Sequence, residues 1–194
     1  MSSNYRLILA SNSPRRKQLL SQLGFGFEVL KVEVVETFPQ ELEIDKVAEY
    51  LAIKKNEACR KLLGQEIVLT ADTTVVFGNR ILGKPIDREE AVNMLKALSG
   101  YQHEVITGVC VSSHDRSLSL SEKTNVLFKS FTPGEINYYV DHYKPYDKAG
   151  AYGIQEWLGL MGVEELSGSY FNVMGLPTHE VYRLLTQEFG IHPA

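Results

Sequence analysis

The chain has 194 residues, of which 44% are hydrophobic and 23% are charged, and these proportions are typical of a globular protein with a substantial core. Its formal net charge of -4 gives no electrostatic reason to bind a nucleic acid backbone or an anionic membrane. No apolar run approaches the ~20 residues of a membrane span, and residues 7–10 are too few for a signal peptide. We therefore expect a single cytoplasmic domain over residues 1–194, with no nucleic acid or membrane partner.

The first half of the chain alternates between predicted strands and helices. Residues 7–10 are a short apolar run typical of a buried strand, and Ser13 followed by Pro14 is typical of the start of a helix. Side chains alternate between polar and apolar over residues 27–35, which predicts a strand. Apolar residues recur at helical spacing over 45–63, which predicts a surface helix. The β-branched run at 67–77 predicts a long central strand. In order, the elements are a strand at 7–10, a helix at 14–23, a strand at 27–35, a helix at 45–63 and a strand at 67–77.

The second half adds a hairpin and three helices. Asp87 with Glu90, and Thr132 with Glu135, have the spacing of a capping box, which marks the first turn of a helix. Residues 146–162 are rich in glycine and aromatic residues with poor periodicity, so we expect a functional loop there. The other elements are a return strand at 81–82, a helix at 87–98, strands at 105–112 and 117–131, and helices at 132–140 and 176–185. This order predicts an α/β or α+β domain around a mixed, twisted central sheet flanked by helices.

The first candidate site is the segment SNSPRR, residues 11–16, between the first strand and the first helix. A helix N-terminus offers unpaired N–H groups and a positive dipole end, and the hydroxyls of Ser11 and Ser13 add donors. Arg15 and Arg16 can each grip a phosphate with two hydrogen bonds. The alternative is an ordinary N-cap with solvated arginines, but arginines in a first turn are unfavourable without an anion. The segment therefore predicts a phosphate site.

A second candidate is Asp72, in the middle of the most apolar predicted strand. An ionised carboxylate there needs an ion pair, hydrogen bonds or a metal to offset a desolvation cost of several kcal/mol. Alternatively, Asp72 bonds nearby backbone. Glu36 is a plausible second carboxylate, or simply a loop residue. The two cysteines and five histidines lack the spacing of a zinc site, so we expect any metal to be held by oxygen.

Two lysines and a glycine-hinged segment complete the candidates. Lys55 and Lys84 can supply positive charge to a polyphosphate, and flanking Gly83 and Pro85 restrict the chain around Lys84. Taken alone, each of these lysines is more typical of a surface residue. The segment DKAGAYGIQ, residues 147–155, places an acid, a base and an amide on one loop, although it is also consistent with a structural turn.

Taken together, these segments resemble the Maf family of nucleotide pyrophosphatases over about residues 7–185. The stretches that carry the resemblance are LASNSPRR at 9–16, ADT at 71–73, GKP at 83–85, LSG at 98–100, DKAGAYGIQ at 147–155 and GLP at 175–177. The resemblance implies hydrolysis of a nucleoside triphosphate between the α and β phosphates, with Mg²⁺ or Mn²⁺, in an active-site cleft between two lobes. It also implies a role in cleaning the nucleotide pool, a link to arrest of septum formation and a homodimer.

In the family pattern, Asp72 matches the proposed general base and shares the metal with Glu36. Arg15, Thr73 and Gln155 match specificity positions and together resemble the branch that acts on dTTP and UTP. Gln155 offers one donor and one acceptor, which suits the N3–H and O4 edge of uracil or thymine. The implied triphosphate ligands are Ser11, Ser13, Arg16, Lys55 and Lys84.

Three positions depart from the family pattern. Val35 stands where an acidic residue usually precedes Glu36. The helix lysine occurs within Lys54-Lys55-Asn56, where Lys55 is the better match. Residues 156–159 carry a bulky residue where small ones are common.

Two alternative functions follow from the same residues. One is a pyrophosphatase for modified nucleotides that uses Trp157 as a stacking platform. The other is a nucleotide-binding regulator of septum formation that hydrolyses little and needs the phosphate site but not Asp72.

Overall fold

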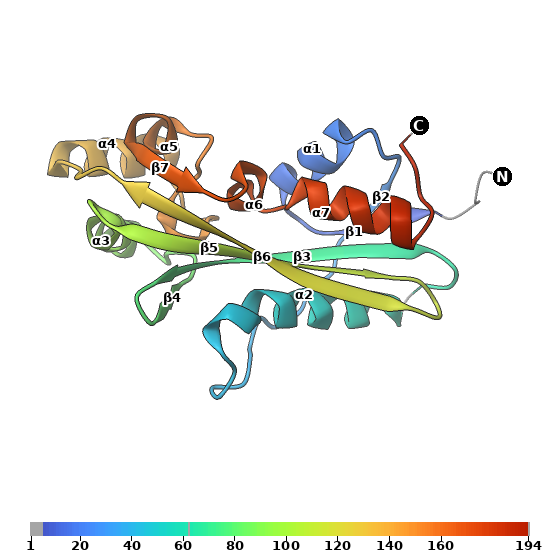
Figure 1. Ribbon diagram of the computed structural model, residues 1–194. Coiled ribbons are helices and arrows are strands. Elements are labelled where there is room, and N and C mark those ends of the chain that lie inside the picture. The colour runs from blue at the N-terminus through green and yellow to red at the C-terminus, as the bar shows by residue number, and fades with distance from the viewer. Residues whose placement is uncertain (1–5, 62, 194) are drawn as a thin grey trace. The chain divides into compact units, whose positions relative to one another are not determined.

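The computed structural model describes residues 6–61 and 63–193 (Figure 1). Within these residues, seven strands form one mixed sheet in the order β2-β1-β3-β5-β6-β7, with β4 paired to β3. The strands are β1 Leu7–Ala10, β2 Glu28–Leu30, β3 Ile67–Phe77, β4 Arg80–Leu82, β5 Gln102–Ser112, β6 Ser117–Phe128 and β7 Val163–Ser167. The helices are α1 Pro14–Gln22, α2 Ile44–Arg60, α3 Arg88–Leu98, α4 Pro133–Tyr143, η1 Ala149–Ala151, α5 Trp157–Gly162, α6 Tyr170–Met174, α7 Thr178–Arg183 and η2 Leu184–Glu188.

The chain forms two compact units. The first unit comprises Met1–Asp72, Thr107–Glu122 and Gly175–Ala194, and the second comprises Thr73–Ile106 and Lys123–Met174. Strands β3, β5 and β6 each contribute one part of their length to each unit. None of the helices in the described part of the chain has both the length and the apolar character that a membrane crossing needs.

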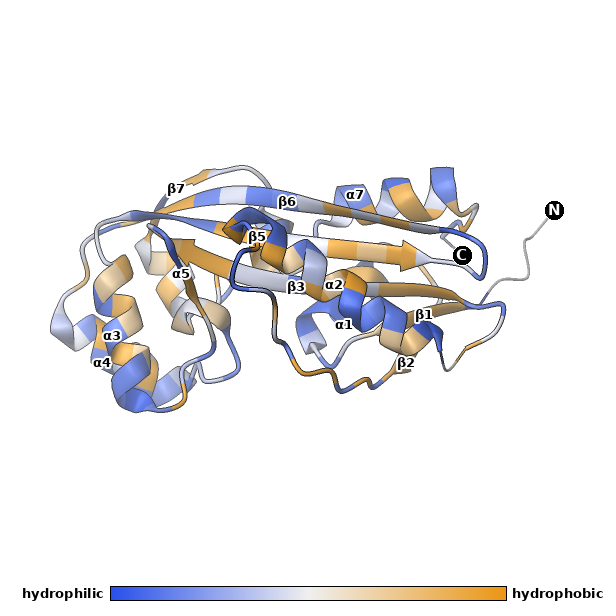
Figure 2. Ribbon diagram, turned by 90° about the horizontal axis from the view of Figure 1, so that it is seen from below, coloured by the Kyte–Doolittle hydropathy of each residue, from blue (hydrophilic) through white to orange (hydrophobic). Residues whose placement is uncertain are grey.

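The first unit is a layered arrangement of helices on parallel strands. Strand β1 pairs in parallel with β2 and β3, with Leu9 opposite Leu69; β1 and the adjoining part of β3 are buried, whereas β2 is largely exposed. Helix α2 covers one face of the strands, while α1 and α7 cover the other (Figure 1). Polar and apolar residues alternate along α7, as expected of a helix that buries one side (Figure 2). The apolar faces of the three helices therefore enclose the strands.

The second unit is built around aromatic side chains. His103, Phe128 and Tyr152 are buried in mutual contact, with ring centroids 4.9 to 5.4 Å apart. Strands β3 and β4 form a hairpin, β7 pairs antiparallel to β6, and α3 packs against α4 and η1. This core supports the predicted loop at residues 146–162.

Most predicted elements are confirmed, because their local patterns are strong. The long strand begins at Ile67 and ends at Phe77 as predicted, and Ser13 caps α1 by accepting from the Arg16 N–H. The Thr132 and Glu135 capping box is present in full. At Asp87 the box is only half formed, because the Glu90 carboxylate accepts from the Ile86 N–H instead. The predicted helix at 45–63 ends at Arg60, and its Leu62 lies outside the described residues.

Several predicted boundaries are wrong. The strand predicted at 27–35 covers only Glu28–Leu30, because β1, its partner, ends at Ala10 opposite Leu30. The last predicted strand ends at Phe128 instead of residue 131, and β5 begins three residues earlier than predicted. The segment expected to be irregular contains η1 and α5, while β7 and α6 were not predicted. These short elements depend on packing and pairing partners that a local pattern does not reveal.

Candidate active site

The serines of residues 11–16 shape the loop between β1 and α1. The Ser11 hydroxyl accepts from the Ser13 N–H at 3.2 Å, and the Ser13 hydroxyl accepts from the Arg16 N–H at 3.4 Å. Ser11 is buried, and Ser13 is half-buried. As acceptors in these bonds, both hydroxyls retain their own protons for donation. The loop therefore has the form predicted for an anion site at a helix N-terminus.

Arg16 lies in the electrostatic field of both predicted carboxylates. Its Nε–H donates to the Gly175 carbonyl at 2.8 Å, which ties α1 to the segment before α7. Burial lowers the pKa of Arg16, Asp72 acts to raise it, Arg15 acts to lower it, and Glu36 acts to raise it. Gly175 belongs to the GLP stretch, but sequence reasoning assigned it no role because the contact uses a backbone carbonyl.

Lys55 joins the two predicted carboxylates. Its ammonium nitrogen donates to Glu36 Oε1 at 2.7 Å and to Asp72 Oδ1. The Asp72 side chain is 11% exposed, whereas that of Glu36 is 47% exposed. The structure therefore brings Lys55, Glu36 and Asp72 together, and it offsets the burial of Asp72 with a direct ion pair.

The neighbouring lysine points elsewhere. Lys54 donates to the backbone carbonyl and the hydroxyl of Thr37, at 2.8 and 3.1 Å. Val35, which replaces an acidic residue of the family pattern, is 75% exposed. Lys55 is therefore the helix lysine of the site, and Glu36 is the carboxylate of its loop that reaches it.

Asn56 sets the position of Lys55. Its buried amide donates to the carbonyls of Val68 in β3 and Cys110 in β5, at 3.1 and 3.2 Å. Its carbonyl oxygen accepts from the Ser112 hydroxyl at 2.5 Å. The amide thus fixes the turn of α2 that carries Lys55 against two strands, which accounts for an asparagine at this departure from the family pattern.

The donor set of Glu36 and Asp72 fits a hard divalent cation. Among residues 6–61 and 63–193 there is no group of three or more His, Cys, Asp and Glu side chains able to hold a metal. Mg²⁺ is commonly held by one or two carboxylates together with phosphate oxygens and water. Two carboxylates that converge on one ammonium nitrogen are consistent with that arrangement.

The remaining predicted residues lie in the second unit. Thr73 is half-buried in β3, and Lys84 and Gln155 are exposed. The Gly150 N–H donates to the Gly83 carbonyl at 3.0 Å, which links the segment of Lys84 to the loop of Gln155. Gly150 has a φ of +68°, and a Cβ atom there would lie 3.0 Å from the Val75 side chain, so glycine is required.

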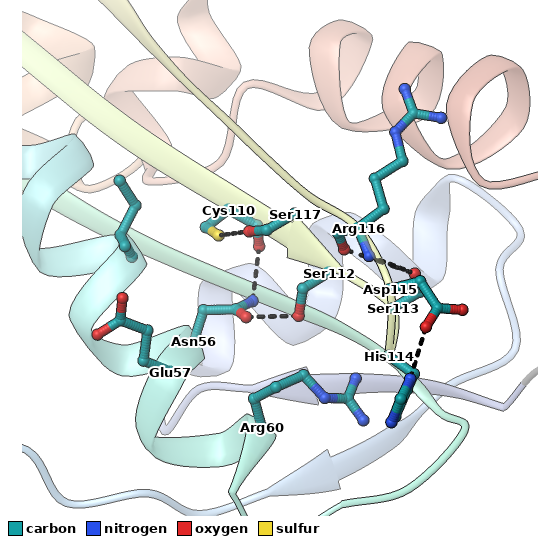
Figure 3. A pocket seen from close by; sticks show the side chains of 11 residues that line it. Asn56, Glu57, Arg60, Cys110, Ser112, Ser113, His114, Asp115, Arg116 and Ser117 are labelled. Carbon is teal, nitrogen blue, oxygen red and sulfur yellow. Dashed lines mark hydrogen bonds and ion pairs between the residues drawn. The ribbon is translucent and has the colours of Figure 1, made fainter.

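A pocket of about 290 Å³ lies elsewhere in the first unit, and the predicted site residues are not among the side chains that line it (Figure 3). Asn56, Ser112 and Cys110 meet at one wall, and Ser113, His114 and Arg116 lie near the β5–β6 turn. The Asn56 amide is occupied by the bonds that hold α2 to the strands, and His114 contacts Asp115 at 2.6 Å. The pocket shares Asn56 with the α2 turn that carries Lys55, but neither Lys55, Glu36 nor Asp72 lines it.

A family model described as Maf-like protein matches residues 6–188 of the chain. The chain belongs to the Maf family. This match covers every predicted site residue, from Ser11 to Gln155.

Curated relatives are similar over almost their whole length. Proteins from Bacteroides fragilis strain YCH46, Parabacteroides distasonis and Flavobacterium johnsoniae are each 47% identical to the chain. The matches cover 94%, 93% and 94% of this chain and 96%, 95% and 94% of the relatives, in that order. Each of these relatives is named dTTP/UTP pyrophosphatase. Among solved structures, the Staphylococcus aureus Ham1 protein covers 63% of this chain and 71% of its own at 17% identity, with a TM-score of 0.45.

The predicted site residues thus fall into two groups, one in each unit of this Maf-family chain. Ser11, Ser13, Arg15, Arg16, Glu36, Lys55 and Asp72 belong to the first unit. Thr73, Lys84 and Gln155 belong to the second. A common site that combines both groups in a cleft, within one domain over residues 1–194, stays a prediction.

Proposed function

We propose that this protein hydrolyses dTTP and UTP between the α and β phosphates, releasing the nucleoside monophosphate and pyrophosphate. The observation that carries the proposal is the ion-paired cluster of Lys55, Glu36 and Asp72, close enough to Arg16 for electrostatic interaction. Relatives of about half-identical sequence, named for this activity, support the choice of substrate. The protein would remove these nucleotides from the cytoplasmic pool.

Asp72 is assigned the role of general base. It is the more buried of the two carboxylates, and its Oδ1 is held by Lys55. In the proposed step, Asp72 takes a proton from water as the water oxygen bonds to the α-phosphorus. The bond from that phosphorus to the α–β bridging oxygen breaks, and pyrophosphate leaves with the electron pair.

The cations of the first unit balance the charge of the triphosphate. Arg16 has its Nε bound to Gly175, so its guanidinium is oriented before the substrate arrives. Lys55 and the donors of residues 11–16 add further positive potential for the charge that develops on the phosphates. Lys84, exposed in the second unit, can contribute another positive charge.

We further propose that Mg²⁺ or Mn²⁺ is required, held by Glu36 and Asp72. When bound, such a cation draws charge from the phosphate oxygens and helps to orient the substrate. Lys55 contacts both carboxylates but offsets only one of their two negative charges, so the pair retains a net charge that suits a cation.

Selection of the base is assigned to Gln155, with Thr73 and Arg15. The exposed Gln155 amide can donate to O4 and accept from N3–H of uracil or thymine. Guanine presents the same acceptor and donor pair at O6 and N1–H but farther from the ribose, and adenine reverses the pair, so a site built for the pyrimidine edge fits both purines less well.

A nucleotide panel tests the proposal. The purified protein with Mg²⁺ or Mn²⁺ is expected to release pyrophosphate from dTTP and UTP at least ~10-fold faster than from GTP or ATP. Product identification by ion-exchange chromatography separates pyrophosphate from phosphate. Equal turnover of the four nucleotides would contradict the assigned specificity, and phosphate release would contradict the assigned bond.

Asp72→Asn tests the catalytic role. We expect it to lower kcat by about 10²-fold to 10⁴-fold, the range typical of removing a general base. Asp115→Asn is the matched control in the same unit, because the Asp115 side chain is 89% exposed and is expected to be irrelevant to hydrolysis. If Asp72→Asn retained an effect on septum formation while losing hydrolysis, the regulatory alternative would be favoured.

A further inference from the structure

A buried hydrogen-bonded cluster surrounds the backbone of Gln155 in the second unit. Tyr139, in α4, accepts from the Gly153 N–H at 3.0 Å through its hydroxyl oxygen, and the same hydroxyl donates to Glu156 Oε2. Lys148 contacts the other oxygen, Glu156 Oε1, at 3.1 Å. Residues on both sides of Gln155 are therefore bound to one tyrosine hydroxyl.

The backbone of this segment forms a tight turn. The Glu156 N–H donates to the Gly153 carbonyl at 3.0 Å, so Gln155 is the third residue of a four-residue turn. The Glu156 carbonyl then accepts from the Leu160 N–H, which starts α5. The Tyr139 hydroxyl also links the two ends of this turn, because it bonds to the Gly153 N–H and to the Glu156 side chain. The turn is thereby fixed by two independent connections.

One ammonium group, that of Lys148, pairs with two carboxylates in the cluster. Lys148 is 7% exposed, and its ammonium also contacts Asp147 at 2.7 Å. Burial and the neighbouring Glu156 carboxylate raise the pKa of Tyr139, so its hydroxyl remains protonated and donates. Both Glu156 oxygens are engaged by Tyr139 and Lys148. Glu156 therefore links Tyr139 and Lys148 and serves as a brace for the turn.

Exposure to solvent distinguishes Gln155 from its neighbours in the turn. Gln155 is exposed, whereas Gly153 and Ile154 before it are buried and Glu156 after it is half-buried. Only the Gln155 side chain thus projects into solvent from a turn that is otherwise anchored.

We propose that Tyr139 is a positioning residue for Gln155, acting through Gly153 and Glu156, with Lys148 holding the brace. This proposal rests on the proposed function, in which the Gln155 amide recognises the pyrimidine base. Glutamine has a flexible side chain that loses much freedom when it is ordered. A turn fixed in advance limits the Gln155 backbone to one orientation, so binding has to order only the side chain and not the backbone as well, which favours the matching base.

A double-mutant cycle tests the positioning role. Tyr139→Phe keeps the ring and removes the hydroxyl, and it is expected to lower kcat/KM for dTTP about tenfold, mainly through KM, with little change for GTP. Gln155→Ala is expected to lower kcat/KM for dTTP at least as much. In the Gln155→Ala background, Tyr139→Phe is expected to change kcat/KM by less than about twofold, because the group that it positions is already absent.

Tyr143→Phe is the matched control. The Tyr143 ring stacks on that of Tyr139 with centroids 5.0 Å apart, on the same helix, and removing its hydroxyl leaves every bond of the cluster in place. Its kcat/KM for dTTP is expected to stay within about twofold of the wild type. Thermal unfolding of each variant gives the temperature below which all assays are run.

Glu156→Gln provides a second route if Tyr139→Phe does not fold. The amide can still accept from Tyr139, but its NH₂ group then cannot accept from Lys148, so the brace is weakened. It is expected to reduce the dTTP to GTP preference in the same direction, and to have no such effect in the Gln155→Ala background.

The possible outcomes separate the two proposals. If Gln155→Ala leaves the dTTP to GTP ratio unchanged, base recognition by Gln155 is wrong, and the positioning role falls with it. If Gln155→Ala lowers the ratio but Tyr139→Phe has no effect, or an equal effect in both backgrounds, the positioning role alone is overturned. A loss for dTTP that disappears in the Gln155→Ala background supports it.

Discussion

At the scale of single residues, Lys55 is the centre of the first unit's site. One ammonium group pairs with two carboxylates of unequal exposure. An unpaired charge would cost more desolvation free energy at Asp72, the more buried of the two, than at Glu36. The adjacent Lys54 carries the same charge but bonds to the loop residue Thr37. The same side chain, one position apart on α2, therefore has two different roles.

Replacing these lysines in turn tests that distinction. Lys55→Met is expected to lower kcat/KM for dTTP by roughly 100-fold, because Glu36 and Asp72 then repel each other and a phosphate contact is lost. Lys54→Met is the control and is expected to stay within about threefold. Steady-state pyrophosphate release measures both, and comparable losses in the two variants would argue against the assignment of Lys55.

At the scale of elements, the close packing of α2 on β5 holds Lys55 in place. Gly108 of β5 lies against the backbone of Ala48, and a Cβ atom at Gly108 would come within 2.3 Å of it. Asn56 then bonds the next turns of α2 to β3 and β5. The helix can approach the strands this closely only because β5 has no side chain at that point.

Gly108→Ala is expected to push α2 away from the strands. The atoms that the new methyl group would meet belong to the backbone of α2, which cannot move aside as a flexible side chain can. We therefore expect the free energy of unfolding to fall by about 3 kcal/mol, with reduced activity. Gly26→Ala is the control in the same unit, because nothing lies within 4 Å of a Cβ atom there. Urea unfolding monitored by circular dichroism compares the two, and equal stability of both variants would refute the close contact.

At the scale of the whole molecule, the two units have different physical characters. The first unit carries the predicted phosphate ligands other than Lys84, and the ion pair of Lys55 and Asp72. The second has an aromatic core in which His103 is 2% exposed, and its Nε2 atom contacts the Tyr152 hydroxyl at 2.7 Å. Burial lowers the pKa of His103 from 6.5 to about 4. The second unit therefore contains a histidine that is neutral at physiological pH.

This histidine predicts a specific sensitivity to acid. The unfolded chain takes up a proton at His103 near pH 6.5 and the folded one only near pH 4, so stability falls as pH drops through that range. Between about pH 7 and 5 the loss attributed to His103 is roughly 2 kcal/mol. Urea unfolding at both pH values is expected to show a smaller loss for His103→Gln than for the wild type. The exposed control His142→Gln should retain the full loss, and an unchanged loss in His103→Gln would contradict the burial argument.

The sequence by itself determined the elements whose signals are local. The β-branched run of β3, the N-cap at Ser13 and the capping box at Thr132 each involve residues within one turn or one strand, so their patterns can be read directly. It also determined the chemistry of the candidate residues, since carboxylates, arginines and lysines carry their charges wherever they lie.

Only the tertiary structure decided which of these groups meet. Lys55 lies 17 residues from Asp72, and Arg16 lies 159 residues from the Gly175 carbonyl, so neither contact has a local pattern. The pairing of Lys55 with both carboxylates, the short β2 and the brace at Glu156 all depend on partners that other segments bring close. Such contacts form only when the chain is folded, because backbone groups and long-range ion pairs are specified by packing and strand pairing instead of by neighbouring residues.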